Sequence, residues 1–256
     1  QSASNPNLML ISNSANNWIE TPVSTVGVNL LNIANGNANQ YLISNGDGTV
    51  QWSDFLSPSW GLTGNSGTID GTNYIGTTDN VALNFKVNNQ KSGRIGTDGD
   101  KSVFLGYLAG ANDDLSNNQN VFVGYQAGYS NTTGYFNTAN GTYALYSNTT
   151  GIHNTANGTN ALWSNTTGYE NTANGHQSLC WNTTGNYNTA NGSFALFKNT
   201  TGFSNTANGH QSLYSNTTGF SNTAYGYQSL YSNTTGSENT ANGTNALWSN
   251  TTGYEN

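Results

Sequence analysis

The chain has 256 residues, of which 34% are hydrophobic and only 7% are charged, and its formal net charge is −7. This composition excludes a large aliphatic core and a charged disordered tail, because average soluble chains are about half apolar and a quarter charged. Nucleic acid and anionic membrane surfaces are disfavoured as partners, because the five basic residues form no cluster that could hold phosphate groups.

The start of the chain indicates neither a membrane span nor a disulfide framework. The first apolar run, residues 8–11, is far shorter than the roughly 20 residues that a spanning helix needs. A chain that begins with Gln1 is compatible with a secreted protein whose leader has been removed, and also with a cloned fragment. Cys180 is the single cysteine, so an intrachain disulfide and a cysteine-based metal site are excluded.

Residues 1–101 predict two β-rich regions. Residues 1–60 are expected to form a tip or attachment region, in which two short strands within 41–52 flank the hairpin signal Asn-Gly-Asp-Gly at 45–48. Residues 61–101 are expected to form a hairpin connector, with a turn at 88–90 and a second strand ending near Ile95. Its first strand is predicted to be half-buried, because apolar side chains alternate along it: Val81, Leu83, Phe85 and Val87.

A 17-residue repeat fills the remaining chain. Asn-Thr-Ala recurs seven times between Asn137 and Asn239, and Asn-Thr-Thr-Gly recurs in step with it. We count repeat positions from the Asn of Asn-Thr-Ala, which places Gly at positions 5 and 15, Leu at 9, an aromatic residue at 10 and Asn at 12. Two degenerate copies precede these, at 102–119 and 120–136, and Asn256 opens a tenth copy, so we expect the array to continue.

Two glycine turns within 17 residues predict a β-coil with extended stretches at positions 1–4 and 7–11. Helices are excluded, since the repeat has no apolar stripe at i, i+3 and i+4 and is about half as long as a helix-hairpin repeat. We therefore predict an all-β protein in which residues 102–256 form a parallel β-solenoid of 17-residue rungs behind the N-terminal hairpins. Asn side chains at positions 1 and 12 are expected to hydrogen-bond from rung to rung.

Positions 9 and 10 are expected to form two ladders on opposite faces, because neighbouring side chains of an extended strand point in opposite directions. The leucines would fill the coil, and the aromatic column would need a cover, which predicts lateral association into a homotrimer. Both faces are apolar where the array begins, in residues 103–105 and 121–123. Sugar stacking is the alternative role for the aromatic column. The ladder residues are Leu145, Leu162, Leu179, Leu196, Leu213, Leu230 and Leu247, and Tyr146, Trp163, Phe197, Tyr214, Tyr231 and Trp248.

Candidate ligand contacts lie at position 16, directly after a turn glycine, although packing within the turn is an alternative. These residues are Tyr135, Tyr169, Phe203, Phe220 and Tyr254. Each Asn-Thr-Thr triplet matches a glycosylation acceptor, and we interpret these triplets as turn chemistry.

No catalytic, cofactor or metal site is predicted. Glu170, Glu238 and Glu255 all occupy position 17, and the last two, one rung apart, have the spacing of a retaining glycosidase pair. A solvated turn is the preferred explanation. The three histidines are too scattered for a metal cluster, and four aspartates favour solvated loops over a weak calcium site. They are His153, His176 and His210, and Asp98, Asp100, Asp113 and Asp114.

The repeats of residues 102–256 resemble the head repeats of trimeric autotransporter adhesins, and Val-Phe-Val-Gly at 121–124 is similar to that family's Ser-Val-Ala-Ile-Gly motif. The resemblance implies left-handed parallel β-rolls assembled into trimers. The repeat is longer than the usual coil of the family, and its neck, heptad stalk and membrane anchor have no counterpart here. The hairpins of residues 1–101, with Asn-Tyr-Ile-Gly at 73–76, resemble modules of phage tail fibres and fibrous bacterial surface proteins.

These features together predict a non-enzymatic, extracellular fibre or adhesin segment, on a cell surface or a phage-like particle. Its expected partners are further copies of itself and a cell-surface or glycan ligand, with no nucleic acid and no membrane insertion. Two alternatives stay open: an ice- or crystal-binding solenoid with threonine ladders, and a fibre-borne polysaccharide depolymerase.

Overall fold

The computed structural model describes residues 8–12, 18–22, 40–44, 50–54 and 74–256, which fall into two units, 1–75 and 76–256. In the first unit, β1 (Leu8–Ser12) pairs antiparallel with β2 (Trp18–Pro22). In the same unit, β3 (Gln40–Ser44) pairs antiparallel with β4 (Val50–Asp54). The last two strands occupy the positions predicted on either side of residues 45–48, and that turn lies outside the described residues.

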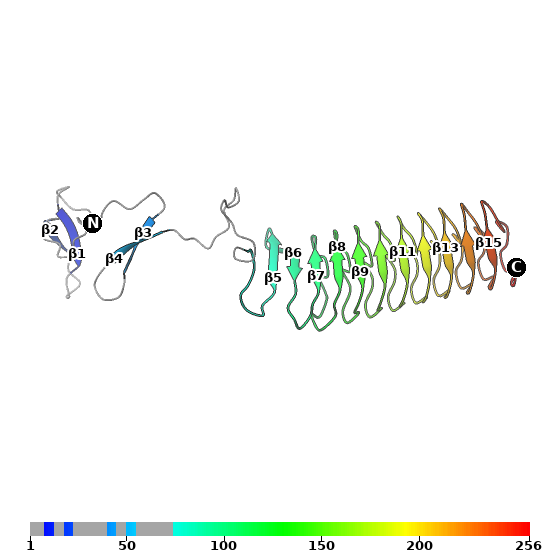
Figure 1. Ribbon diagram of the computed structural model, residues 1–256, viewed down its shortest axis with the longest axis horizontal. Helices are drawn as coiled ribbons and strands as arrows, with labels where there is room; N and C mark the ends of the chain where they lie inside the picture. Colours follow the sequence, from blue (N-terminus) through cyan, green and yellow to red (C-terminus); the bar gives the residue numbers. More distant parts are fainter. Residues whose placement is uncertain (1–7, 13–17, 23–39, 45–49, 55–73) are drawn as a thin grey trace. The chain divides into compact units, whose positions relative to one another are not determined.

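The second unit contains one sheet of 11 strands, β5 to β15, which lie side by side in chain order (Figure 1). The hairpin of β5 (Leu83–Val87) and β6 (Gln90–Ile95) is antiparallel, and β6 pairs antiparallel with β7. From β7 onward all pairs are parallel, and from β9 onward partners are 17 residues apart, as Thr155 and Thr172 are. The parallel strands are β7 (Val103–Leu105), β8 (Val121–Val123), β9 (Thr138–Asn140), β10 (Thr155–Asn157), β11 (Thr172–Asn174), β12 (Thr189–Asn191), β13 (Thr206–Asn208), β14 (Thr223–Tyr225) and β15 (Thr240–Asn242).

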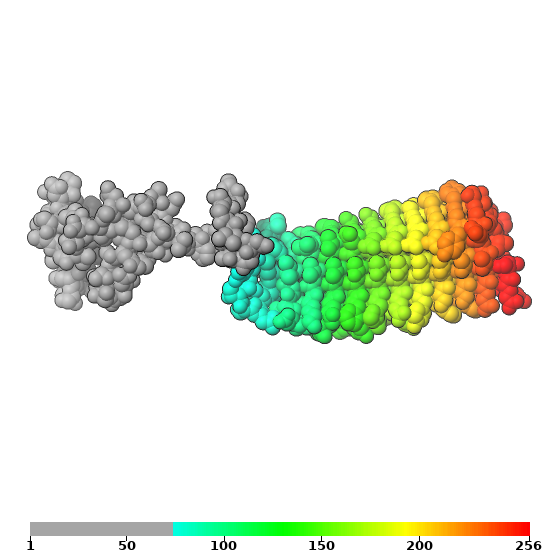
Figure 2. Space-filling model, in the orientation of Figure 1, coloured from blue at the N-terminus to red at the C-terminus, as the bar shows by residue number. Residues whose placement is uncertain are grey.

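The described residues contain no helix, so an all-β parallel solenoid of 17-residue rungs is confirmed. Figure 2 shows the successive rungs as parallel rows of atoms. The β5–β6 hairpin, expected in a connector at 61–101, continues the solenoid sheet, and the boundary between the units falls earlier, after residue 75. The turn between β5 and β6 consists of Asn88 and Asn89, which both have positive φ, 47° and 59°, as a two-residue hairpin turn requires.

The predicted burial of β5 is wrong. Leu83 is half-buried, but Val81, Phe85 and Val87 are exposed, because the described residues place nothing over this face of the hairpin. The outward face of the sheet therefore carries uncovered apolar side chains at the start of the array.

The prediction of a second extended stretch in each rung, at positions 7–11, is also wrong. This segment is a turn in which positions 7 and 9 adopt left-handed backbone, for example Asn160 at φ 57° and Leu162 at φ 50°. A leucine in this conformation costs about 1–2 kcal/mol, which its full burial offsets. The backbone still bonds to the next rung, since the Leu162 N–H donates to the Ser178 carbonyl at 3.0 Å.

Glycine is required at positions 5 and 15 because the rungs approach each other closely there. Gly158 has φ 134°, and a Cβ on it would lie 2.7 Å from the carbonyl carbon of Gly175 in the next rung. At position 15, a Cβ on Gly168 would meet the Gly185 carbonyl oxygen and the Asn165 side chain. Side chains at either position would push successive rungs apart.

The core is thin and contains one large and two small side chains per rung. From the third copy onward these are Leu at position 9, Ala at position 3 and Ala or Ser at position 8, and in rungs with a neighbour on both sides all three are fully buried. The first two copies exchange the sizes at positions 3 and 9, with Phe104 opposite Gly110 and Phe122 opposite Gly128. A Cβ on Gly110 would lie 2.9 Å from the Phe104 ring, so the two exchanges depend on each other.

Two buried asparagine ladders run the length of the array, at the predicted positions 1 and 12. The Asn171 Nδ2 donates to Asn154 Oδ1 at 3.1 Å, and the Asn182 Nδ2 donates to Asn165 Oδ1 at 2.8 Å. Both amides also donate to the Gly185 carbonyl, at 2.8 and 3.0 Å. Each ladder is directional, because the bonds between its asparagine side chains all run from an amide to the oxygen of the rung before.

Both ladders end on the carboxylate of Asp113. Its Oδ2 accepts from the Asn120 Nδ2 at 3.0 Å and from the Asn131 Nδ2 at 2.9 Å. Its Oδ1 accepts from the Leu115 N–H at 2.9 Å and from the Asn118 Nδ2 at 3.0 Å. Asp113 therefore ends both asparagine ladders as a buried carboxylate that only accepts hydrogen bonds. The prediction that it lies in a solvated loop is wrong.

Two basic side chains cover the first rung of the core. The Lys91 Nζ donates to the Gly110 carbonyl at 2.6 Å and lies 4.7 Å from the centre of the Phe104 ring. Burial lowers the pKa of Lys91. Arg94 is buried beside it and forms an ion pair with Asp100, which is also buried and not solvated as predicted. These contacts protect the apolar end of the coil from water.

Candidate attachment surfaces

The outward sheet face of the later rungs is a regular polar array. Thr at position 2 and Asn at position 4 share this face, because alternate residues of a strand point the same way. The asparagines form a third ladder, in which the Asn157 Nδ2 donates to Asn174 Oδ1 at 2.9 Å and the Asn174 Nδ2 donates to Asn191 Oδ1 at 2.8 Å. Tyr225 interrupts the ladder, as the partner of Asn208 in the next rung. Sequence analysis missed this ladder, although Asn follows Asn-Thr-Ala in six of its seven copies and could have indicated it.

The same face is apolar at its N-terminal end. Cross-strand partners lie on one face, and the registers Leu83↔Ile95, Ile95↔Val103 and Phe85↔Gly93↔Leu105 join the hairpin to the first rungs. We call the following set the apolar sheet face: Leu83, Phe85, Ile95, Val103, Leu105, Val121 and Val123. Leu105 is 44% exposed and Val121 38% exposed, so the surface is open to a partner.

The aromatic residues of position 10 form a stacked, mostly half-buried column at one corner of the coil. Phe197 and Tyr214 lie 5.1 Å apart with planes 13° apart, and Tyr214 and Tyr231 lie 5.0 Å apart at 4°. Tyr146 and Trp163 stack at 6.2 Å and 12°. Each ring therefore covers the faces of its neighbours, which contributes about 0.5–1.5 kcal/mol per pair. Because position 10 lies in a turn, the argument that Leu and aromatic ladders occupy opposite strand faces does not hold.

The position 16 residues lie at another turn. Phe203 and Phe220 stack at 4.9 Å and 2°, whereas Tyr169 meets Tyr187 of the following rung at 5.2 Å and 82°. Tyr135 contacts His153 at 5.7 Å. Tyr135, Phe203 and Tyr254 are exposed, and Tyr169 and Phe220 are half-buried. This surface offers exposed rings and packed rings side by side.

The acidic residues do not gather into a site in the part of the chain that the structure describes. Glu170, Glu238 and Glu255 are exposed at their turns. Asp114 accepts from the Ser116 N–H at 3.1 Å, and this bond lowers the pKa of Asp114. Among the described residues there is no group of three or more His, Cys, Asp or Glu that could hold a metal ion.

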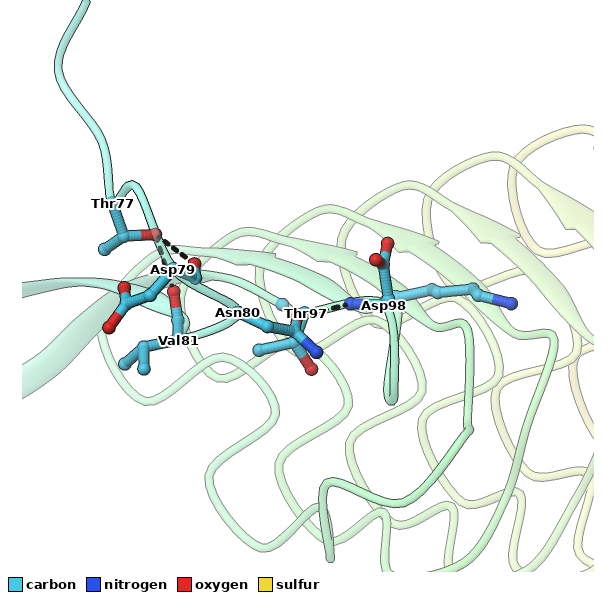
Figure 3. A pocket seen from close by; sticks show the side chains of 8 residues that line it. Thr77, Asp79, Asn80, Val81, Thr97 and Asp98 are labelled. Carbon is cyan, nitrogen blue, oxygen red and sulfur yellow. Dashed lines mark hydrogen bonds between the residues drawn. The ribbon is translucent and has the colours of Figure 1, made fainter.

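An open hollow lies beside the β5–β6 hairpin (Figure 3). Thr77 Oγ1 donates to the Val81 carbonyl at 2.8 Å, and the Asp98 N–H donates to Asn80 Oδ1 at 3.2 Å. The first bond lies within the segment before β5, and the second joins that segment to the loop after β6. The lining residues are Thr77, Asp79, Asn80, Val81, Gly96, Thr97, Asp98 and Lys101.

Comparison with protein-family models, with curated proteins and with solved structures gave no match. Within the described residues there is no helix with the length and hydrophobicity that a membrane crossing needs.

Proposed function

We propose that this chain is a segment of an extracellular fibre or adhesin, carried on a cell or a phage-like particle, which attaches by repeated weak contacts rather than by catalysis. The observation that carries the proposal is the in-register stacking of nearly identical rungs, which presents the same surface groups once per rung. Residues 120–256 carry only four charged side chains, Glu170, Lys198, Glu238 and Glu255. Such a surface suits glycans and other neutral ligands better than anionic polymers.

Attachment should depend on the number of rungs. Deleting residues 188–221 removes two complete rungs and joins Tyr187 to Asn222, which begins a rung as Asn188 does. We expect binding to target cells or a glycan array to fall steeply, because linked weak sites gain avidity by about 100-fold or more. Binding of the intact chain should survive raised salt. Binding that vanishes at moderate salt, or that resides wholly in residues 1–101, would contradict the proposal.

We further propose that the rods associate laterally into a homo-oligomer, as a trimer, through the apolar sheet face. The support is the exposure of large apolar side chains on a face that is polar in the later rungs except at Tyr225. The resemblance to trimeric adhesin heads agrees with this arrangement.

The variant Val121→Thr/Val123→Asn tests the association, because it gives β8 the outward residues that β9 carries as Thr138 and Asn140. We expect the native mass of the intact chain to be that of a trimer. The variant should be monomeric at protein concentrations at which the wild-type chain is still a trimer. Its rungs should stay folded, because these side chains point out of the coil. A wild-type chain that is monomeric and melts sharply would contradict the proposal.

A second candidate function, binding to ice or another crystalline surface, is favoured by the regular Thr and Asn columns on the outward sheet face. The ladders considered from the sequence were the threonines at positions 13 and 14, whereas the structure presents Thr at position 2 and Asn at position 4. The position 13 hydroxyl instead bonds to the next rung, as Thr166 Oγ1 does to the Thr183 carbonyl at 3.0 Å. Lateral association would bury the Thr and Asn columns, so thermal hysteresis from a monomer would favour this candidate over the fibre.

A further inference from the structure

The aromatic column is interrupted in one rung, residues 171–187. Position 10 is occupied there by Cys180, which is buried, and burial raises the pKa of its thiol to about 11. The aromatic residue is displaced to position 11, where Trp181 is 46% exposed. The rung therefore replaces a packed ring by an uncharged buried thiol and moves a large ring outward.

The Trp181 ring stands at right angles to the column. Its centre lies 5.7 Å from that of Trp163 with planes 82° apart, and 6.5 Å from that of Phe197 with planes 85° apart. Trp163 precedes Trp181 by one rung and Phe197 follows it by one rung, and neither ring is stacked on Trp181. Tyr214, by contrast, is stacked on both sides, so its ring faces are occupied. Trp181 therefore combines an exposed side chain with ring faces that carry no stacked neighbour from the column.

An uncovered indole face binds the apolar C–H face of a pyranose ring, because aromatic faces are electron-rich and pack against polarised C–H groups. The surroundings carry little charge, which favours a neutral sugar. In the rung of Trp181 and the two rungs beside it, the charged side chains are Glu170, at position 17, and Lys198, at position 11 of the next rung. Lys198 shares the repeat position of Trp181, but its Nζ lies 5.4 Å from the centre of the Tyr214 ring, one rung further on.

Hydrogen-bonding groups are available in the same rung. Gln177 occupies position 7 of this rung and is half-buried. In the next rung, the residue at position 7 is Phe194, whose ring centre lies 5.5 Å from that of the column residue Phe197. Because the rungs repeat, position 7 is the neighbour of position 10, and we expect the Gln177 amide to be within reach of a sugar on Trp181. Ligand sites of this kind combine an apolar platform with a few polar groups that fix orientation.

We propose that Trp181 is the stacking platform for a neutral hexopyranose of a glycan chain, so that one rung of the array is a specific sugar site. The proposal rests on the attachment function above and assigns it a ligand class and a residue.

The repeat itself supplies the test variant. Residues 176–185 and 210–219 differ only at the two positions of interest, where Cys180 and Trp181 correspond to Tyr214 and Ser215. The double variant Cys180→Tyr/Trp181→Ser therefore turns this segment into one that already folds in the same array with a continuous stack. Trp248→Tyr is the matched control, because it also removes one tryptophan of position 10 but lies in the last rung, stacked on Tyr231 and four rungs away from Trp181.

Binding of cellohexaose, N-acetylchitohexaose and mannohexaose to the full chain is measured by calorimetry, with thermal melts to verify folding. We expect at least one hexaose to bind the wild-type chain and the Trp248→Tyr variant equally, and to bind the double variant at least tenfold more weakly. Equal binding by the double variant, or no binding of any hexaose by the wild type, would overturn the assignment. Attachment of the same proteins to cells distinguishes the two proposals: attachment that depends on rung number while no hexaose binds leaves the fibre function intact and removes only the Trp181 site.

Discussion

Replacing Leu213 by Asp should destabilise its part of the array by at least about 4 kcal/mol, because the carboxylate would enter a thin apolar core without a partner. The Leu213 side chain is 0% exposed and lies between identical leucines of the rungs before and after it. Its φ is 50°, a conformation that Asp adopts more readily than Leu, so backbone strain would not add to the loss. The measurement is hydrogen exchange of rung amides, since long repeat arrays need not unfold in one step.

Leu247→Asp is the matched control for this substitution. Leu247 occupies the same repeat position but is 38% exposed in the final rung, so its carboxylate can reach water. We expect less than half of the effect seen at Leu213. Equal effects at the two sites would show that burial in the coil is not what stabilises the rungs.

Replacing Asp113 by Asn should destabilise the N-terminal end of the array by about 3 kcal/mol. The carboxylate accepts four hydrogen bonds, two of them from the asparagine ladders. An amide has one acceptor oxygen and brings two donors of its own, so at least one NH2 group would face the donors of Asn118, Asn120 or Asn131. Hydrogen exchange should show the loss in the first two rungs and leave the last rungs unchanged.

Asp114→Asn provides the control for this second prediction. Asp114 is adjacent in sequence and accepts from Ser116 and Asn118, but it is exposed, so water can replace those bonds. We expect a much smaller change in stability. A large effect at Asp114 with none at Asp113 would contradict the terminator role of Asp113.

Much of the fold could be predicted from the sequence because it repeats. The strict 17-residue period, the glycines at positions 5 and 15 and the lack of a helical stripe led to a parallel β-solenoid with asparagine ladders, and the structure has both. These features follow from local spacing, since identical residues in successive rungs must stack when the rungs are in register.

The candidate site was harder to predict, because ring orientation is a property of packing. Sequence analysis placed the aromatic residues of position 10 in one column, and Cys180 occupies that position in the rung 171–187. It could not tell that Tyr214 would be stacked on both sides while Trp181 would stand at right angles to Trp163 and Phe197. Which ring faces remain free depends on neighbours one rung away.

The sequence by itself therefore determined the class of fold, the length of each rung and the residues of the leucine column and of the two buried asparagine ladders. Only the tertiary structure decided how positions 7–11 turn, which face of the first rungs is open and where the ladders end. A leucine such as Leu162 enters left-handed backbone because burial and rung-to-rung bonds outweigh its local preference, and no local pattern records that balance. Asp113 likewise terminates two ladders whose asparagines, Asn120 and Asn131, lie 7 and 18 residues further along the chain, and the folded coil brings them together.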